Sequence, residues 1–374
     1  MGKGSRAVAM MLVLACGASD DDEAAGTSEG STSATTSTSA STSTSTSTTS
    51  ATSTTGTTSD PDTSSSDASS DEGTTTGGDG SGLVIDGEGF RFDGAPIFLL
   101  GVSYFDGRDW QAADLDGLAQ RGWNLVRVWL DWSDDGFFGP DGALSEDGSQ
   151  ALLELVAAAR ARDMIVDVTI LDPELLVFPA DTDHRVVAVQ SVTTALLDAN
   201  NVLFDVMNEH DHPSGPIAHD EGGTITAAVK AIDPDRIVTI SSTGGHLIAD
   251  DGTVQAAMVD EELDVVGIEV VTPHLPRTPD WASVTGLRVG NLRAHLQQHG
   301  ASVPIYLQEE ARRGHSGLDP SAEEFVLAAQ QARDSGAAGW IFHTDAGFEL
   351  GPEGFFALLD EVETVVVDTL PGSL

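Results

Sequence analysis

Two glutamates, Glu209 and Glu309, each follow directly on a short apolar segment of the sequence. "VLFDVM" leads into Asn208-Glu209, and "VPIYLQ" leads into Glu309-Glu310. A pair of carboxyl groups on one site can cleave a glycosidic bond, because one protonates the leaving oxygen while the other attacks the sugar or activates water. A general acid needs a rigid mount and partial burial, which raises the pKa of a carboxyl group. We therefore predict a catalytic pair formed by Glu209 and Glu309, with Glu310 as the alternative to Glu309.

The chain must bring these distant positions together, and its pattern indicates how. From residue 83 on, short apolar runs alternate with amphipathic helical patterns, which is typical of a parallel sheet covered by helices. The expected strands are 97–103, 124–130, 164–170, 202–207, 236–242, 264–271, 303–308 and 338–342. The expected helices are 112–122, 149–163, 184–199, 223–233, a short one near 254–259, 285–300, 321–336 and 354–366.

Eight such units in about 290 residues predict an α/β fold, a closed (β/α)₈ TIM barrel spanning 83–374, since single barrels of this kind have roughly 250 residues. Residues 83–96 are predicted to form a hairpin that closes the barrel floor. An open sheet that binds a nucleotide needs a G-x-G-x-x-G turn after its first strand, and "GVSYFDG" does not match it.

Further candidate residues lie where the expected strands end, which is where active sites of such barrels form. Arg127 lies on the second strand, and His274 follows the sixth. Aromatic rings stack well on sugars, so Trp340, Trp132 and Tyr104 are candidates to line sugar subsites; packing in the core is the alternative for each.

Taken together, "NLVRVWLDW", "VLFDVMNE", "PIYLQE" and "AGWIF" resemble the clan A glycoside hydrolases, and most closely family 5, the cellulase and mannanase type. The resemblance extends from about residue 83 to the C-terminus. It implies an arginine near the end of strand two, Asn-Glu at strand four, a nucleophilic glutamate five residues after a proline at strand seven, and a tryptophan platform on strand eight. The matching positions here are Arg127, Asn208, Glu209, Glu309 and Trp340.

The resemblance also implies a mechanism that retains the anomeric configuration. Glu309 would attack the sugar, and Glu209 would act as acid and then as base, across a separation of about 5–5.5 Å. Asn208 would bind the sugar 2-hydroxyl, and Arg127 would keep the nucleophile ionised. The predicted substrate is a neutral β-linked glucan or mannan, with no cofactor. The alternatives are a barrel that binds carbohydrate without cleaving it and, less favoured, a surface scaffold without a sugar ligand.

The sequence departs from the family in two places. Family 5 enzymes usually have a histidine after strand three, and "VTILDPE" has none. They also have a histidine and a tyrosine after strand six, where this chain has Glu269 or Val270, with His274 slightly later and no tyrosine. These differences indicate a divergent member.

The segment "EHDHPSGPIAHD" concentrates His210, His212 and His219 among three acids. A metal site is one interpretation, and a polar loop at the barrel mouth is the other. The spacing matches no strong zinc signature such as H-E-x-x-H. We therefore predict a polar loop and no metal.

The N-terminal residues indicate export. Residues 1–15 combine a basic start with a short apolar run that is too short to span a bilayer, as in a cleaved signal. "VLAC" resembles the lipobox of bacterial lipoproteins, which implies lipidation of Cys16, the single cysteine. An ordinary signal peptide with an incidental cysteine is the alternative. Residues 16–82, rich in Ser and Thr, are predicted to be a disordered tether. The protein would be lipid-anchored at the outer membrane or cell surface, or secreted.

The net charge of −43 at pH 7 bounds the partners. So acidic a chain argues against nucleic acid and anionic lipid surfaces and suits a neutral ligand such as a carbohydrate. The lipid anchor would be the only membrane contact. One cysteine allows no internal disulfide. We expect a monomer.

Overall fold

The computed structural model describes residues 81–132, 136–173, 181–315 and 317–374. The predicted signal, Cys16 and nearly all of the tether lie outside the described residues, so these predictions stay untested. Within the described ranges, no helix combines the length and the apolar character that crossing a membrane requires.

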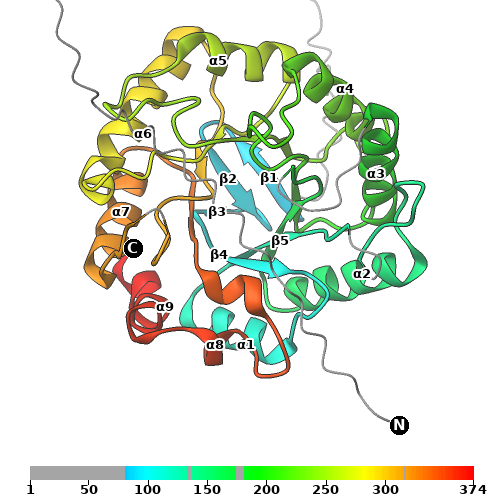
Figure 1. Ribbon diagram of the computed structural model, residues 1–374, viewed down its shortest axis with the longest axis horizontal. Coiled ribbons are helices and arrows are strands. Elements are labelled where there is room, and N and C mark those ends of the chain that lie inside the picture. The colour runs from blue at the N-terminus through cyan, green and yellow to red at the C-terminus, as the bar shows by residue number, and fades with distance from the viewer. Residues whose placement is uncertain (1–80, 133–135, 174–180, 316) are drawn as a thin grey trace, which may run out of the picture. The chain divides into compact units, whose positions relative to one another are not determined.

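A closed ring of parallel strands forms the centre of the domain (Figure 1). Seven strands pair in the order β11-β12-β4-β5-β6-β7-β8. A two-residue strand, β9, follows β8 and pairs with β10, and a parallel bridge from Val271 to Ile305 joins this pair to the next segment of the ring. The bounds are β4 Leu99–Asp106, β5 Leu125–Trp129, β6 Ile165–Thr169, β7 Val202–Asp205, β8 Val238–Thr239, β9 Ser241–Ser242, β10 Thr272–Pro273, β11 Tyr306–Leu307 and β12 Gly339–Phe342. The predicted (β/α)₈ barrel is confirmed.

Helices surround this ring on all sides, as Figure 1 shows. They are α1 Ala112–Arg121, α2 Glu146–Arg160, α3 Thr182–Ala195, α4 His219–Lys230, α5 Ala256–Glu261, α6 Trp281–His299, α7 Ala322–Asp334, α8 Phe355–Leu358 and α9 Glu361–Ser373. Local sequence sets where several begin. Ser321, for example, accepts a hydrogen bond from the Glu324 amide, and the Glu324 side chain returns one to the Ser321 amide, which closes a capping box at the start of α7.

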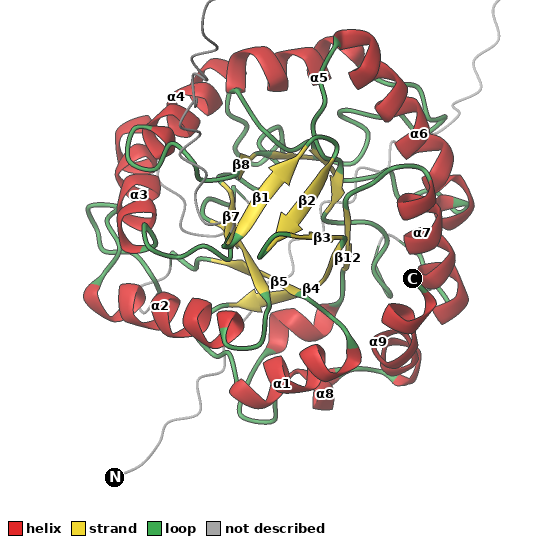
Figure 2. Ribbon diagram, turned by 180° about the vertical axis from the view of Figure 1, so that it is seen from behind, coloured by secondary structure: helices red, strands yellow, loops and turns green. Residues whose placement is uncertain are grey.

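The floor of the barrel is covered by a small antiparallel sheet of β1 Leu83–Asp86, β2 Gly89–Phe92 and β3 Ala95–Ile97. Figure 2 shows β1 and β2 lying across the ring of strands. Phe90 and Phe92 pack in one buried cluster with the apolar residues that begin the barrel strands. The predicted hairpin is therefore present, with a third strand added.

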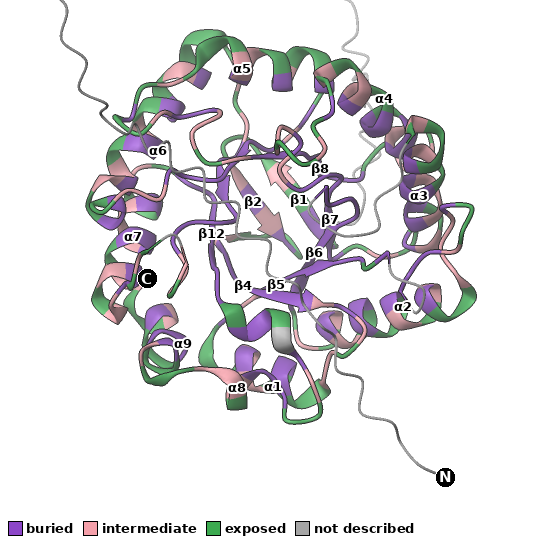
Figure 3. Cartoon of the chain, viewed as in Figure 1, coloured by how far each residue is buried: buried purple, intermediate pink, exposed green. Residues whose placement is uncertain are grey.

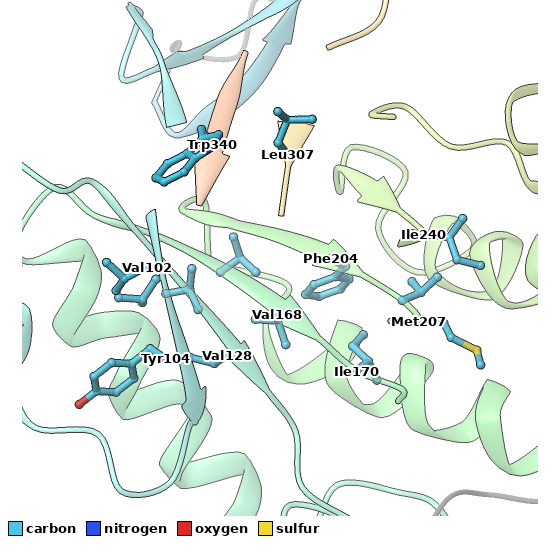
Figure 4. Close-up of a cluster of buried hydrophobic side chains, with 14 of the residues drawn as sticks. Val102, Tyr104, Val128, Val168, Ile170, Phe204, Met207, Ile240, Leu307 and Trp340 are labelled. Carbon is cyan, nitrogen blue, oxygen red and sulfur yellow. The ribbon is translucent and has the colours of Figure 1, made fainter. Parts of the chain in front are cut away.

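Alternation along the strands separates two cores. Outward residues such as Val102, Val128 and Phe204 pack against the helices, and Figure 4 shows this cluster. The inward helix faces and the strands are buried together (Figure 3). Inside the ring, apolar residues at the strand starts give way to polar ones two positions later: Leu125 and Arg127 on β5, Ile165 and Asp167 on β6, and Leu203 and Asp205 on β7. The polar layer above an apolar floor places the site at the carboxyl ends of the strands.

The sixth predicted strand, 264–271, is wrong over most of its length. Residues Glu262–Val266 form a π-helical turn that Gly267 ends with φ of 75°, and the strand pairing begins only at Val271. A short apolar run can belong to a strand or to a helix end, and periodicity alone does not separate the two. The final predicted helix, 354–366, is likewise divided into α8 and α9.

Candidate active site

Glu209 and Glu309 converge across the mouth of the barrel from the ends of β7 and β11. One side-chain oxygen of each glutamate and one ring nitrogen of His274 all lie within 4.8 Å of one another. His274 Nδ1 is 2.8 Å from Glu209 Oε1 and 3.9 Å from Glu309 Oε2. The exposed fractions of the two glutamate side chains are 12% and 8%, so both are mostly removed from water while still reaching the surface.

Glu309 is surrounded by positive charge. Arg127 Nη1 donates a hydrogen bond of 2.7 Å to Oε1, and Arg277 Nη2 lies 3.5 Å from Oε2. Burial alone raises the pKa of Glu309, but His274, His343, Arg127 and Arg277 together lower it well below its ordinary value. Burial lowers the pKa of His343, so this histidine is neutral and adds no positive charge. We therefore attribute the stabilisation of the Glu309 carboxylate to His274 and the two arginines. Glu309 is therefore an ionised carboxylate at neutral pH.

His343 lies beside Glu309 as a neutral group. Its Nε2 is 3.4 Å from Glu309 Oε2, and its Nδ1 is 2.8 Å from Ser103 Oγ. Burial lowers the pKa of His343 well below its ordinary value, with Arg312 adding to the effect. Arg312 Nη1 lies 3.4 Å from the same Nε2 and can only donate, which is consistent with an Nδ1–H tautomer that donates to Ser103.

Arg127 fixes the geometry of the site from below. It is completely buried, and its Nη2 donates to Asp205 Oδ2 at 2.7 Å and to Asn208 Oδ1 at 2.8 Å, while its Nε donates to Thr169. Burial lowers the pKa of Arg127, but the charges of Glu309, Asp205 and Asp167 raise it overall, so the guanidinium stays charged. One cation thus orients the nucleophile candidate and the asparagine before Glu209.

Asp167 lies deeper inside the barrel and is less well neutralised. Its Oδ2 accepts hydrogen bonds from Tyr306 and Gln308 and lies 3.7 Å from Arg127 Nε. Burial, only partly offset by Arg127, raises the pKa of Asp167 to about 7. Asp167 and Asp205 are the acidic residues of the otherwise apolar strands β6 and β7, and both side chains point into the interior of the barrel.

Glu209 and His274 form the other half of the site. The Glu209 backbone has a left-handed φ of 43°, uncommon for a residue with a side chain, and its amide donates to Ser241 Oγ at 3.1 Å. Burial lowers the pKa of His274, but the charge of Glu309 and the contact with Glu209 raise it overall. His274 therefore bridges the two carboxylates, at the position that the sequence suggested after strand six.

Glu310 points away from the barrel mouth, into the layer between sheet and helices. It accepts hydrogen bonds from Thr285 on α6 and from the indole N–H of Trp340. Burial raises the pKa of Glu310 to about 7. These contacts favour Glu309 over Glu310 as the group that faces Glu209.

In the described part of the chain, no contact joins any of the three aromatic candidates to Glu209 or Glu309. Trp340 is fully buried with its indole on Glu310, so its predicted role as a sugar platform is wrong. Tyr104 is also fully buried, donating to Asp114 beneath α1, and cannot line a subsite. Trp132 is 8% exposed, stacks on Phe138, and donates to the Ile170 carbonyl; no contact in the described ranges joins it to Glu209 or Glu309. Trp340 and Tyr104 occupy strand positions that face the surrounding helices, so their rings do not enter the barrel.

Several groups at the site were not predicted. Arg277 and His343 both lie against Glu309, and Phe348, 37% exposed, stacks on Phe105 beside His343. His343 sits one residue beyond the eighth strand, so the rule that site residues follow strand ends could have found it. Phe348 belongs to a turn of 3₁₀ helix, Asp345–Glu349, and no period in the sequence marks it.

A barrel with two carboxylates at its mouth is the arrangement that a glycoside hydrolase requires, and comparison with known proteins gives the family. The model of "Cellulase (glycosyl hydrolase family 5)" matches residues 86–283, just over half of the chain. The chain belongs to glycosyl hydrolase family 5. The matched range includes Arg127, Asn208, Glu209 and His274 and ends before Glu309.

Solved structures share the fold at low identity. The β-mannanase of the blue mussel Mytilus edulis is 15% identical over 77% of this chain and 96% of its own, with a TM-score of 0.53. The endo-1,4-β-mannanase of Rhizomucor miehei is 14% identical over 78% and 99%, with a TM-score of 0.55. That of Eisenia fetida is 18% identical over 78% and 95%, with a TM-score of 0.53. No curated protein matches the chain.

Proposed function

We propose that the protein is a retaining glycoside hydrolase in which Glu309 is the nucleophile and Glu209 the acid/base. The observation that carries the proposal is the convergence of the two carboxylates, with oxygens within 4.8 Å of each other beside His274. Retaining enzymes hold their carboxyl groups about 5–5.5 Å apart, whereas inverting enzymes need roughly 6.5–9.5 Å to admit a water molecule. The family and the electrostatics of Glu309 support the same assignment.

The proposed reaction has two displacements. The ionised Glu309 attacks the anomeric carbon while Glu209 donates a proton to the departing oxygen, which leaves a glycosyl ester on Glu309. Glu209 then removes a proton from water, which attacks the same carbon and releases Glu309. Because Asn208 Oδ1 is held by Arg127, its amide N–H₂ is the group that donates to the sugar 2-hydroxyl.

We propose a β-linked mannan or glucan as the substrate. The structures of similar fold include two endo-1,4-β-mannanases and one β-mannanase. The net charge of −43 repels acidic polysaccharides, so a neutral chain is favoured. Phe348 takes the place of Trp340 as the proposed sugar platform, because it is the exposed ring beside His343.

The test is hydrolysis of a panel of mannans, glucans and xylans, followed as new reducing ends. We expect release from a mannan or glucan, and loss of release in Glu209→Gln and in Glu309→Gln. Binding to a glycan without cleavage, by an intact protein, would favour the non-catalytic carbohydrate-binding alternative. A real activity that neither substitution changes would show that the residues are wrongly assigned.

We further propose that the enzyme is an exported monomer held at the outer membrane or cell surface by a lipid on Cys16. Fatty-acid labelling of the protein in cells, compared with Cys16→Ser, tests the anchor. Label that persists in the variant would rule out this attachment.

A further inference from the structure

Four side chains next to Glu209 and its loop make a second polar cluster. We define it as the histidine cluster: His210, His219, His246 and Glu262. One ligand atom from each lies within 4.8 Å of the others. They come from separate segments: the loop after β7, the first turn of α4, the loop after β9, and the start of the π-helical turn. We propose that this cluster is a structural site for a divalent transition metal, with zinc the favoured ion.

The strongest observation is that the cluster holds buried polar atoms without partners. Within the part of the chain that the structure describes, His210 Nδ1, His219 Nε2, His246 Nε2 and Glu262 Oε2 are all buried and make no hydrogen bond. Buried polar groups in proteins nearly always have a partner, because an unpaired one costs free energy. Four such atoms from four neighbouring side chains indicate a missing common partner.

The outer contacts orient two of the imidazoles as metal ligands. His219 Nδ1 lies 2.7 Å from Glu261 Oε2, and His246 Nδ1 lies 2.9 Å from Asp211 Oδ2. Asp211 is itself fixed by the Thr243 amide at 2.7 Å. Histidines that bind metals usually donate their other N–H to a carboxylate in this way, which fixes the tautomer and leaves Nε2 as the ligand. In both residues Nε2 is the unpaired atom.

A simple ion pair explains less of the cluster. A protonated His210 would pair with Glu262, and their Nε2 to Oε1 distance is 3.3 Å. That pair would leave Nε2 of His219 and Nε2 of His246 buried and unpartnered. It would also keep Glu262, which is fully buried, on one long contact. A divalent cation satisfies all four residues and neutralises the carboxylate.

The donor set selects the ion. Imidazoles suit Zn, Cu, Fe and Ni better than Mg or Ca, and four protein ligands of N and O type make a closed tetrahedral zinc site with bonds of about 2.0–2.2 Å. Such bonds place ligand atoms roughly 3.3 Å apart, so ligand atoms already within 4.8 Å need only small side-chain movements. The π-helical turn that begins at Glu262 fits this role, since such turns are frequent at functional sites.

The site would hold the loop that carries the proposed acid/base. His210 follows Glu209 directly, and Glu209 has the left-handed backbone described above. A metal that ties His210 to α4, to the loop after β9 and to Glu262 would fix the direction of the Glu209 side chain. The sequence prediction of a polar loop without metal is thereby replaced by a proposal of a metal-bound loop.

The first experiment measures metal in the full chain, purified without added metal or chelator and then dialysed. We expect about one equivalent of zinc per chain by inductively coupled plasma mass spectrometry. After exchange, Co²⁺ should give the intense visible absorption of a tetrahedral site. A strong chelator should lower the midpoint of thermal unfolding, and Zn²⁺ should restore it. These measurements do not depend on glycosidase activity, so they fail or succeed separately from the proposed function.

Variants locate the ion. In His246→Asn and in His219→Asn, retained zinc should fall at least tenfold. In Asp211→Asn, which removes only an outer partner, zinc affinity should weaken by about 10–100-fold. His184→Asn is the matched control, because His184 also pairs its Nδ1 with a carboxylate at 2.7 Å but is exposed and is not one of the four cluster residues. It should keep its zinc.

The proposal is overturned if the wild-type chain holds no metal, takes up none from tenfold excess Zn²⁺ or Co²⁺, and unfolds at the same temperature with or without chelator. It is equally overturned if the variants of His219 and His246 fold and bind zinc as tightly as His184→Asn. If those variants do not fold, the cobalt spectrum of the wild type decides between a tetrahedral site and none.

Discussion

Glu309 and Glu310 are neighbours in sequence but lie in two different regions of the molecule. Glu309 faces the barrel mouth, where arginines and His274 lower its pKa well below the ordinary value. Glu310 faces the layer between sheet and helices, where burial raises its pKa to about 7. The comparison shows that charge neighbours, and not burial alone, decide whether a carboxyl group is ready to act as a nucleophile.

The largest expected effect separates these two residues by activity. Glu309→Gln should lower kcat by on the order of 10⁴-fold or more, the scale seen when a catalytic nucleophile is removed. Glu310→Gln should leave kcat within a few-fold, because Glu310 contacts Thr285 and Trp340 and not the cleft. Steady-state kinetics on the best polysaccharide of the panel measures both. Equal losses in the two variants would break the comparison.

Removing the buried guanidinium of Arg127 should lower the free energy of unfolding strongly. Arg127→Met leaves Asp205 and Glu309 buried without their partner, and breaking a buried pair on one side costs about 3–5 kcal/mol. Urea unfolding at pH 7 measures the change. Arg121→Met, which breaks an exposed pair with Asp368 at the same 2.7 Å distance, should cost no more than about 1 kcal/mol.

The raised pKa of Glu310 predicts a dependence of stability on pH. In the folded protein its pKa is about 7 and its ordinary value is 4.5, so the folded state binds the extra proton between these limits. Stability from this group is therefore lost as pH rises from about 4.5 to about 7. Glu310→Gln cannot titrate and so does not lose this stability. The free energy of unfolding of the variant minus that of the wild type should therefore rise over this window by up to about 3 kcal/mol, at about 1.4 kcal/mol per pKa unit.

Denaturant unfolding of both proteins at pH 5 and at pH 8 measures the difference. Asp167, whose pKa is also raised to about 7, is present in both proteins and cancels in the comparison. A gap that stays constant with pH would show that Glu310 is not protonated in the folded protein.

The smallest effect concerns the sugar platform. Phe348→Ala should lower kcat/KM by up to roughly tenfold, since an aromatic stacking contact is worth about 0.5–1.5 kcal/mol. Leu197, which follows α3 and is 50% exposed, serves as a control, and Leu197→Ala should change neither activity nor stability appreciably. Trp340→Phe should instead lower the free energy of unfolding by about 1–3 kcal/mol, because the substitution removes the indole N–H that donates to buried Glu310.

The barrel was predictable because eight apolar runs and the helices between them repeat a pattern that few folds share. The same pattern placed Arg127, Asn208, Glu209, Glu309 and His274 at one end of the barrel, and the structure brings these five together. Trp340 and Tyr104 were misplaced because the sequence does not say which side of a short strand faces inward. Both point outward, where aromatic residues fill the helix layer.

Contacts between distant loops were beyond prediction. His210 and His219 share the segment "EHDHPSGPIAHD", but His246 and Glu262 come from two other segments, and no regular spacing of ligands links all four. Arg277 likewise reaches Glu309 only because the loop after β10 folds over the barrel mouth. Such sets are defined by the folded loops, whose conformation depends on the whole domain.

The most direct test of the central claim is to trap the glycosyl-enzyme. An activated 2-fluoro mannoside and its glucose counterpart, which slow release of the sugar from a nucleophile, would be incubated with the protein and the labelled peptide located by mass spectrometry. We predict one sugar on Glu309 and none on Glu310 or Glu209. A sugar on Glu310, or hydrolysis with inverted configuration and no label, would contradict the account.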